Sequence, residues 1–536
     1  MMKKVIKKLL AALLAVAMVC AMAIPAFAYD TKEDLDTKHE YDAFQIFKGD
    51  VSDDNTKISH VEWGQNIPHP EDFLPKLRAD STLSSEFANA DSLQKVLDVM
   101  KDWKTSDDNS IAFARFVCNY IYTDANANST PVKQGGHTGG FELDEAGYYL
   151  IVDTSPFSDG DSYHAYNSFL LKVNKAHYHV QITPKVVKPT VEKKVYDNDD
   201  GSSWGDNDGW GSSADHAINE EFQFQLIATL PASENNGRAY DYYNEYAVRF
   251  NDTLSDGITF DKLDKVEIAN VDGVNPQVIN ADNYTRNPNG SQSFKLSIDN
   301  VKTCARAANL DLNKGATITV TYTAHLNETA YVNTAGGDTK NKNRVYLEYS
   351  NNPRISTSLD HTHESEVCVY TYQLNNTKYH DSIGQSNELK GAGFKLYSDK
   401  DCKNEVELYQ EGNLYYPIKD AKKGVKKPVE MFSDDKGQFN VKGLDAGTYY
   451  LKETTIPDGY SACPDTPIVI SATHDEYNVN LSGDSNLTNN IVNQKAGGIT
   501  LPSTGGIGTT LFYVVGGGLM VAAIVLLVTK KRMENK

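Results

Sequence analysis

Residues 317–322 read Thr-Ile-Thr-Val-Thr-Tyr, and residues 344–349 read Arg-Val-Tyr-Leu-Glu-Tyr. In both stretches apolar and polar side chains alternate, which is the pattern of a β-strand with one buried face. Short runs of this kind, rich in Tyr and Thr and separated by Gly, Asn and Asp, dominate the chain from residue 140 onward. The sequence therefore predicts an all-β fold of tandem immunoglobulin-like β-sandwich domains rather than an α/β enzyme.

The segment from Ser92 to Tyr122 has a different periodicity. Its apolar residues recur at helical spacing, and they are Leu93, Val96, Leu97, Met100, Ile111, Ala114, Phe116 and Val117. We therefore expect the first domain to carry one or two added helices whose apolar stripes face its core.

Two stretches divide the chain. Residues 184–189 read Pro-Lys-Val-Val-Lys-Pro, an extended connector whose prolines disfavour helix. Residues 351–364 are polar and precede a new strand pattern. These boundaries predict a first domain over residues 29–187, a middle domain over 188–363 and a third domain over 364–496.

Residues 1–28 have the features of a secretory signal peptide. An apolar run from Leu9 to Ile24 follows a basic start formed by Lys3, Lys4, Lys7 and Lys8. Small residues before Tyr29 then form a cleavage site, so we expect processing between Ala28 and Tyr29. The alternative is an uncleaved membrane anchor, for which the run is short.

Near the other end, the chain reads Leu501-Pro502-Ser503-Thr504-Gly505. An apolar stretch over residues 509–529 follows, long enough to cross a bilayer as a helix, and the basic tail 530–536 would hold its end in the cytoplasm. The pentapeptide resembles the LPxTG sorting signal, at which sortase transpeptidases cleave after Thr and transfer its carbonyl to an amine. The resemblance implies a protein anchored to peptidoglycan at a Gram-positive cell surface. A membrane anchor with a coincidental motif is the alternative.

The net charge of −20 argues against nucleic acid as a partner and fits a solvated extracellular surface. Of the six cysteines, Cys20 lies in the signal peptide, and the other five are too sparse for a disulfide scaffold. A pairing of Cys402 with Cys463 is left open, because connectivity cannot be deduced from sequence.

The acidic loop from Asp197 to Gly211 raises the question of calcium. Its Asp-Asn-Asp-Asp-Gly run places Gly one residue early for an EF-hand loop, and no Glu closes it, so a solvated insertion is the simpler interpretation. The pair His361 and His363 is too isolated for a zinc site. We expect no metal site, no cofactor and no enzyme of the hydrolase type, because no catalytic motif of that kind is present.

Lys193, Asp252 and Asn343 each fall on the apolar face of a predicted strand. Each would be unfavourable if buried alone. Together they can react, because desolvation favours a neutral amine that attacks the Asn amide while a protonated carboxyl polarises the carbonyl and carries protons as ammonia leaves. The product is an amide cross-link between strands. The alternative is that Lys193 reaches solvent and Asn343 starts a turn.

The third domain repeats these elements in the runs 369–374, 389–397, 450–454 and 491–493. They resemble the CnaB-type fold of Gram-positive pilins and adhesins, in which the Glu of a Leu-x-Glu-Thr motif catalyses a Lys–Asn isopeptide bond. The resemblance implies a bond between Lys378 and Asn493 with Glu453 as the catalyst.

The middle domain resembles the middle domain of Spa-type backbone pilins, and the tandem domains as a whole resemble CnaA/CnaB-type sandwiches. That resemblance implies a bond between Lys193 and Asn343, with Asp252 as the catalyst. In the first domain Asp153 stands where the third domain has Glu453, and no inward Lys–Asn pair accompanies it, so no bond is expected there.

The first connector also carries a resemblance. Residues 180–185 read Val-Gln-Ile-Thr-Pro-Lys and resemble the Val-x-Val-Tyr-Pro-Lys pilin motif, whose Lys attacks the sortase acyl-enzyme. Thr183 replaces Tyr, and Ala176 stands where Trp is often found, so the motif is degenerate. The resemblance implies that Lys185 accepts the carbonyl of Thr504 from another copy.

The whole pattern resembles a sortase-assembled major pilin. We therefore expect a secreted shaft subunit of a cell-wall-anchored pilus, polymerised head to tail with copies of itself by sortase and supporting adhesion to host or neighbouring-cell receptors. The alternative is a monomeric wall-anchored adhesin or a minor, basal or tip, pilin, which would not need Lys185.

Overall fold

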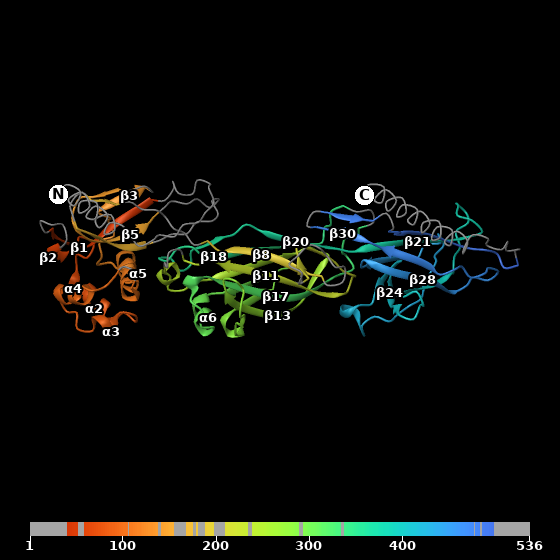
Figure 1. The fold of residues 1–536 in the computed structure, drawn as a ribbon, viewed down its shortest axis with the longest axis horizontal. Helices are drawn as coiled ribbons and strands as arrows, with labels where there is room; N and C mark the ends of the chain where they lie inside the picture. Colours follow the sequence, from red (N-terminus) through yellow and green to blue (C-terminus); the bar gives the residue numbers. More distant parts are fainter. Residues whose placement is uncertain are drawn as a thin grey trace, which may run out of the picture.

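The computed structural model describes residues 40–51, 58–104, 107–137, 141–154, 168–174, 178–180, 188–197, 209–233, 238–288, 293–333, 337–475, 478–482 and 485–497. Within these residues strands predominate, and they form three groups that follow one another along the long axis of the molecule (Figure 1). The expected all-β fold with helices added to its first part is confirmed.

The first group is built on a sheet of strand order β2-β1-β5-β6, to which β3 is added beside β1, while β4 and β7 form a separate pair. The bounds are β1 (Glu40–Val51), β2 (Ile58–Trp63), β3 (Lys133–His137), β4 (Phe141–Leu143), β5 (Gly147–Asp153), β6 (Ser168–Val173) and β7 (Tyr178–Val180).

A helical layer lies beside this sheet (Figure 1). It contains α2 (Pro70–Ala79), α3 (Ser84–Phe87), α4 (Leu93–Met100) and α5 (Asp108–Thr123). The predicted helices are α4 and α5, whereas α2 and α3 were not foreseen. Helix α2 is short and has Pro75 inside it, which obscures its period, although Pro70 suits the first turn and Phe73 is buried.

The second group is a sandwich of two sheets. One has the order β14-β13-β17-β11-β8-β9, and the other has the order β10-β20-β18-β12-β16-β15 with β19 beside β18. The bounds are β8 (Thr190–Tyr196), β9 (Trp210–Gly211), β10 (Ser213–Asp215), β11 (Glu221–Leu230), β12 (Val248–Leu254), β13 (Ile258–Asn270), β14 (Gln277–Val278), β15 (Thr285–Pro288), β16 (Ser293–Ile298), β17 (Ala316–Leu326), β18 (Lys342–Ser350), β19 (Leu359–His361) and β20 (Ser365–Tyr370). Short helical turns connect them: η3 (Ala239–Tyr242), η4 (Ala281–Asn283), α6 (Val301–Ala307) and η5 (Leu312–Lys314).

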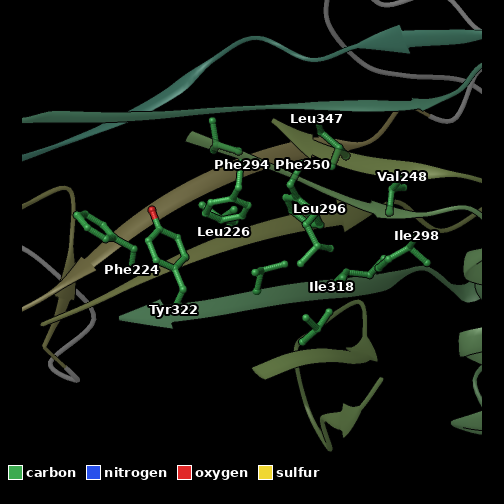
Figure 2. Packing of buried hydrophobic residues seen from close by; sticks show 14 of the residues in the cluster. Phe224, Leu226, Val248, Phe250, Phe294, Leu296, Ile298, Ile318, Tyr322 and Leu347 are labelled. Atoms are coloured by element: carbon green, nitrogen blue, oxygen red, sulfur yellow. The ribbon is translucent and has the colours of Figure 1, made fainter. Parts of the chain in front are cut away.

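The core of this sandwich lies between the facing sheets (Figure 2). Along β11, every second side chain is buried, because successive residues of a strand point to opposite faces. In β17, Ile318, Val320 and Tyr322 are buried as their alternation predicted. Thr321 and Thr323 on the other face are buried too, and Thr323 donates a hydrogen bond to Asp264 of the neighbouring strand.

The third group is a second sandwich. Its sheets have the orders β24-β25-β27-β21-β32 and β23-β22-β28-β29, with β26 beside β22, and β30 and β31 form a separate pair. The bounds are β21 (Tyr372–His380), β22 (Gly393–Tyr397), β23 (Glu405–Val406), β24 (Leu408–Glu411), β25 (Leu414–Pro417), η6 (Asp420–Lys422), β26 (Met431–Phe432), β27 (Asn440–Leu444), β28 (Gly447–Thr455), β29 (Thr466–Ile470), β30 (Ala472–His474), β31 (Val479–Leu481) and β32 (Thr488–Asn493).

Strand β20 joins the two sandwiches. Its residues were expected to open the third domain at 364, but they pair with β18 and β10 in the sheet of the second group. The chain then passes through the buried Thr371 directly into β21 of the third group. The strand pairing therefore places the boundary between the second and third sandwiches at Thr371.

Both ends of the chain lie outside the described residues, including the expected signal peptide 1–28, the sorting motif 501–505, the apolar stretch 509–529 and the basic tail 530–536. None of the helices in the described ranges is long and apolar enough to cross a membrane.

The sandwich core predicts a position-specific loss of stability. Ile318 is fully buried in β17, so Ile318→Ala should destabilise the second sandwich by about 2–5 kcal/mol through lost burial and the cavity left behind. Thr319→Ala, on the opposite face of the same strand, is the control and should change stability by less than about 0.5 kcal/mol. Thermal unfolding followed by calorimetry would compare them, and equal effects would show that the two faces are not distinguished.

Candidate functional site

Lys193 lies in the middle of β8, opposite Leu226 of β11. Its side chain is fully enclosed, as is that of Asp252, with which it forms an ion pair. Lys193 belongs to one sheet of the second sandwich and Asp252 to the other, so this contact spans the core. The side chain of Lys193 therefore points into the core, as its position in the strand pattern predicts.

Asp252 and Asn343 come from neighbouring antiparallel strands. Asp252 of β12 is opposite Val345 of β18, and Leu254 is opposite Asn343. Since alternate residues share a face, the two polar side chains project into the same part of the core. Both are buried, and the amide oxygen Oδ1 of Asn343 has no hydrogen-bond partner among the described residues.

Tyr322 of β17 connects these three groups. Its hydroxyl donates to Oδ2 of Asp252 at 2.6 Å and accepts from Nδ2 of Asn343 at 2.6 Å. Nζ of Lys193 also donates to this hydroxyl, at 3.2 Å. Figure 2 shows the Tyr322 hydroxyl among apolar side chains of the core. Sequence reasoning placed Tyr322 inward but could not identify its partners, which come from strands far away along the chain.

Burial sets the charge state of this group. The ring of Phe224 lies 5.3 Å from Nζ of Lys193 and gives the amine an apolar wall. Burial lowers the pKa of Lys193 to about 8, against the opposing effect of Asp252. Burial likewise raises the pKa of Asp252, against the opposing effect of Lys193. Both shifts favour the neutral amine and the neutral acid.

The third sandwich contains a second group of the same composition. Lys378 lies in β21 and Asn493 in the parallel neighbour β32, where Lys378 is opposite Ile491 and His380 is opposite Asn493. Nζ of Lys378 donates to Oδ1 of Asn493 at 2.5 Å. The amine is therefore in contact with the amide that it would attack.

Glu453 reaches this pair from β28 in the other sheet. Its Oε1 accepts from Nδ2 of Asn493 at 2.7 Å and lies 3.4 Å from Nζ of Lys378, and both ionisable side chains are fully enclosed. The ring of Phe394 lies 5.1 Å from Nζ of Lys378, as Phe224 lies beside Lys193. Each sandwich therefore holds a Lys, an Asn and an acid against an aromatic ring.

The contacts have a chemical consequence. The lone pair of a neutral Lys Nζ can add to Cγ of the Asn amide, and the carboxylic acid can then protonate the departing nitrogen. The resulting carboxylate takes a proton from Nζ, and ammonia leaves as the bond between Cγ and Nδ2 breaks and the bond between Cγ and Nζ remains. The reaction needs no cofactor. Its reactants are all side chains of the chain itself.

The disulfide left open between Cys402 and Cys463 is not formed, since both residues are free thiols. Sγ of Cys402 lies 3.7 Å from Asp465, whereas the backbone N–H of Cys463 donates to Oε2 of Glu453 at 2.9 Å. Burial raises the pKa of the Cys463 thiol. Cys463 thus helps to hold the carboxylate of the third-sandwich group.

In the first group of elements, Asp153 is buried at the end of β5. Among the described residues between 40 and 180, no lysine is buried. The expectation of no bond there remains a prediction.

Several sequence-predicted residues lie outside the described ranges, namely Ala28, Tyr29, Lys185, Leu501, Pro502, Ser503, Thr504 and Gly505. Lys188, the neighbour of the expected acceptor, is described, and it is buried with 8% of its surface exposed. Of the acidic loop, Asp197 and the residues from 209 onward are described, and Asp197 is buried rather than solvated.

Comparisons with known proteins bear on the C-terminal part of the chain. Residues 374–486 match the SpaA family, a prealbumin-like fold domain, and residues 493–535 match the LPXTG cell wall anchor motif. No curated protein matches the chain.

Solved structures that resemble it include three pilins. The T6 backbone pilin of serotype M6 Streptococcus pyogenes has a TM-score of 0.47 and 16% identity, covering 88% of this chain and 100% of the pilin. The full-length major pilin SpaD from Corynebacterium diphtheriae has a TM-score of 0.43 and 16% identity, and the match covers 89% of this chain and 96% of the pilin. A 35 kDa C-terminal fragment of the major pilin GBS80 of Streptococcus agalactiae has a TM-score of 0.39 and 21% identity, and the match covers 57% of this chain and 99% of the fragment.

The two matched segments are adjacent, with the anchor motif directly after the third sandwich. The chain therefore ends in a prealbumin-like SpaA domain followed by an LPXTG anchor, and it is a surface protein anchored to the Gram-positive cell wall.

Proposed function

We propose that this protein is the shaft subunit of a covalently polymerised pilus, and that Lys193–Asn343 and Lys378–Asn493 isopeptide bonds stabilise it. The observation that carries the proposal is the presence of one buried Lys, acid and Asn group in each of two consecutive sandwiches. Two such groups would each be unfavourable if they stayed unreacted, because they hold polar groups away from water.

The positions of the groups suit a subunit that is pulled along its length. Lys193 comes shortly after the expected acceptor Lys185 in the sequence, and Asn343 lies in β18, which pairs with the exit strand β20. In the third sandwich, Lys378 lies in the entry strand β21 and Asn493 in the last strand β32. A pull from Lys185 to Thr504 would then pass through both cross-links, and residues 194–342 and 379–492 would be bypassed.

Polymerisation follows from the two ends of this path. Thr504 of the sorting motif is the acyl donor to sortase, and Lys185 of a second copy is the acceptor, which gives an open head-to-tail filament. The last subunit is passed to peptidoglycan. Lys188 is a poorer acceptor, because its buried side chain is less accessible to the sortase acyl-enzyme.

A monomeric wall-anchored adhesin or a minor pilin is the alternative function. It would keep the anchor and both cross-links, because these stabilise any exposed surface protein. The connector lysine discriminates the two, since the adhesin would not need it.

The first test of the proposal is a mass. The mature protein should be lighter than its sequence by one ammonia for each of two bonds, and a mass equal to the sequence would sink the isopeptide assignment. Glu453→Ala should prevent the bond of the third sandwich and Asp252→Ala that of the second, so that each variant regains the mass of one ammonia. Each variant should also resist heat and protease less well. The exposed Asp272→Ala is the matched control and should keep both bonds.

The contacts of Tyr322 predict a positioning role. Tyr322→Phe keeps the ring but removes the hydroxyl that touches Lys193, Asp252 and Asn343, a loss of about 1.5–3 kcal/mol for such hydrogen bonds. Bond formation in the second sandwich should therefore slow by about tenfold or more. Pulse-labelled protein from cell-free translation, sampled over time, would show it.

The third-sandwich bond of the same molecules is the internal control for that experiment, because Tyr322 does not contact it. Equal slowing of both bonds would indicate a general folding defect. Unchanged formation of both would remove Tyr322 from the reaction.

The acceptor assignment predicts a ladder. Cell-wall extract of the wild type, blotted for this protein, should show a series of high-mass species, and Lys185→Ala should reduce it to a wall-anchored monomer. Lys188→Ala is the matched control and should keep the ladder. A ladder that persists in the Lys185→Ala strain means that another amine is used, and a single wild-type band supports the adhesin.

A further inference from the structure

A buried polar cluster lies where the second and third sandwiches meet. Asp197 follows β8 and Asp215 ends β10, both in the second sandwich, whereas His474 ends β30 of the third. The side chains of all three residues are buried, with at most 1% of their surface exposed. We name these three residues the joint cluster. No local sequence motif indicates it, because its members are far apart along the chain.

The three side chains converge on one point. Nε2 of His474 lies 3.8 Å from Oδ2 of Asp197 and 3.9 Å from Oδ1 of Asp215, and one ligand atom from each residue lies within 4.8 Å of the others. The two nitrogen-to-oxygen distances are too long for direct hydrogen bonds. They suit atoms that bind one ion between them, since zinc lies about 2.0–2.2 Å from nitrogen and oxygen ligands.

Neighbouring groups orient two of the three ligands, His474 and Asp215. Oγ of Ser213 lies 2.8 Å from Nδ1 of His474, and if it accepts the Nδ1–H proton, the lone pair of Nε2 faces the carboxylates. The hydroxyl of Tyr372 donates to Oδ2 of Asp215 at 2.7 Å, leaving Oδ1 toward the histidine. Such supporting contacts to ligands are characteristic of metal sites.

Charge favours a divalent cation here. Two carboxylates held close together away from water repel each other, and a cation placed between them offsets that repulsion. A divalent ion neutralises both. One imidazole with two carboxylates suits Zn²⁺, whereas Ca²⁺ takes six to eight oxygen ligands and Mg²⁺ keeps several waters.

We propose that Asp197, Asp215 and His474 bind one Zn²⁺ ion that fastens the second sandwich to the third. The ion links two ligands of the second sandwich to one ligand of the third. This link supplements the covalent connection of the chain at Thr371. It stiffens the joint reversibly, unlike the isopeptide bonds, which lie inside single sandwiches. The proposal does not depend on those bonds or on polymerisation.

Zinc titration of the wall-released protein tests the site. After treatment with a chelator and dialysis, titration with Zn²⁺ alone in a calorimeter should give one bound ion per subunit and raise the unfolding temperature. His474→Gln, which keeps the size of the side chain, should abolish both effects. Ser213→Ala should weaken zinc binding about 10- to 100-fold, because it removes the group that orients His474.

Two comparisons keep the result clear. His380→Gln, in the same sandwich but away from the joint, should bind zinc as the wild type does. Chelated His474→Gln should unfold at the same temperature as the chelated wild type, which separates loss of metal from loss of fold. A wild type that takes up no zinc, or a His474→Gln variant that still takes up one ion, overturns the proposal. So does a joint that responds to pH through His474 but not to zinc, since a protonated imidazole would then be the cation.

Discussion

A lysine amine held away from water beside a carboxyl group is the constraint on which both sandwiches depend. In water Lys193 would be an ammonium and Asp252 a carboxylate, and neither form can react with an amide as proposed. Burial between the sheets shifts both pKa values toward the neutral forms. In the proposed reaction, the group becomes reactive only when the sheets have closed around it, so that folding precedes bond formation.

The same constraint explains why the surrounding residues are aromatic. Phe224 beside Lys193 and Phe394 beside Lys378 exclude water and face the amine with the negative side of a ring. The two sites differ in their strand geometry. In the second sandwich, Lys193 and Asn343 lie in facing sheets, whereas in the third sandwich Lys378 and Asn493 lie in neighbouring parallel strands. The shared chemistry thus rests on the burial and contacts of the side chains, and not on one arrangement of strands.

The connection between the sandwiches is also specified by polar contacts. Thr371 donates its hydroxyl to the carbonyl of Leu444, and its own carbonyl accepts from the N–H of Asn333. Because buried polar groups need partners, these contacts fix the angle at which β20 passes into β21. The elongated arrangement in Figure 1 is consistent with a joint that holds the two sandwiches in line.

The sequence by itself determined the strand alternation, the helices α4 and α5, the inward orientation of Lys193, Asp252 and Asn343, and the anchor motif. These features are local, because the period of two or 3.6 residues follows from the geometry of a single strand or helix. Only the tertiary structure decided that Tyr322 meets all three groups, that β20 pairs with the second sandwich, that Cys402 and Cys463 are free thiols, and that Asp197 and His474 converge. Those contacts join residues separated by tens to hundreds of positions, and they arise when sheets pack face to face, which no local period encodes.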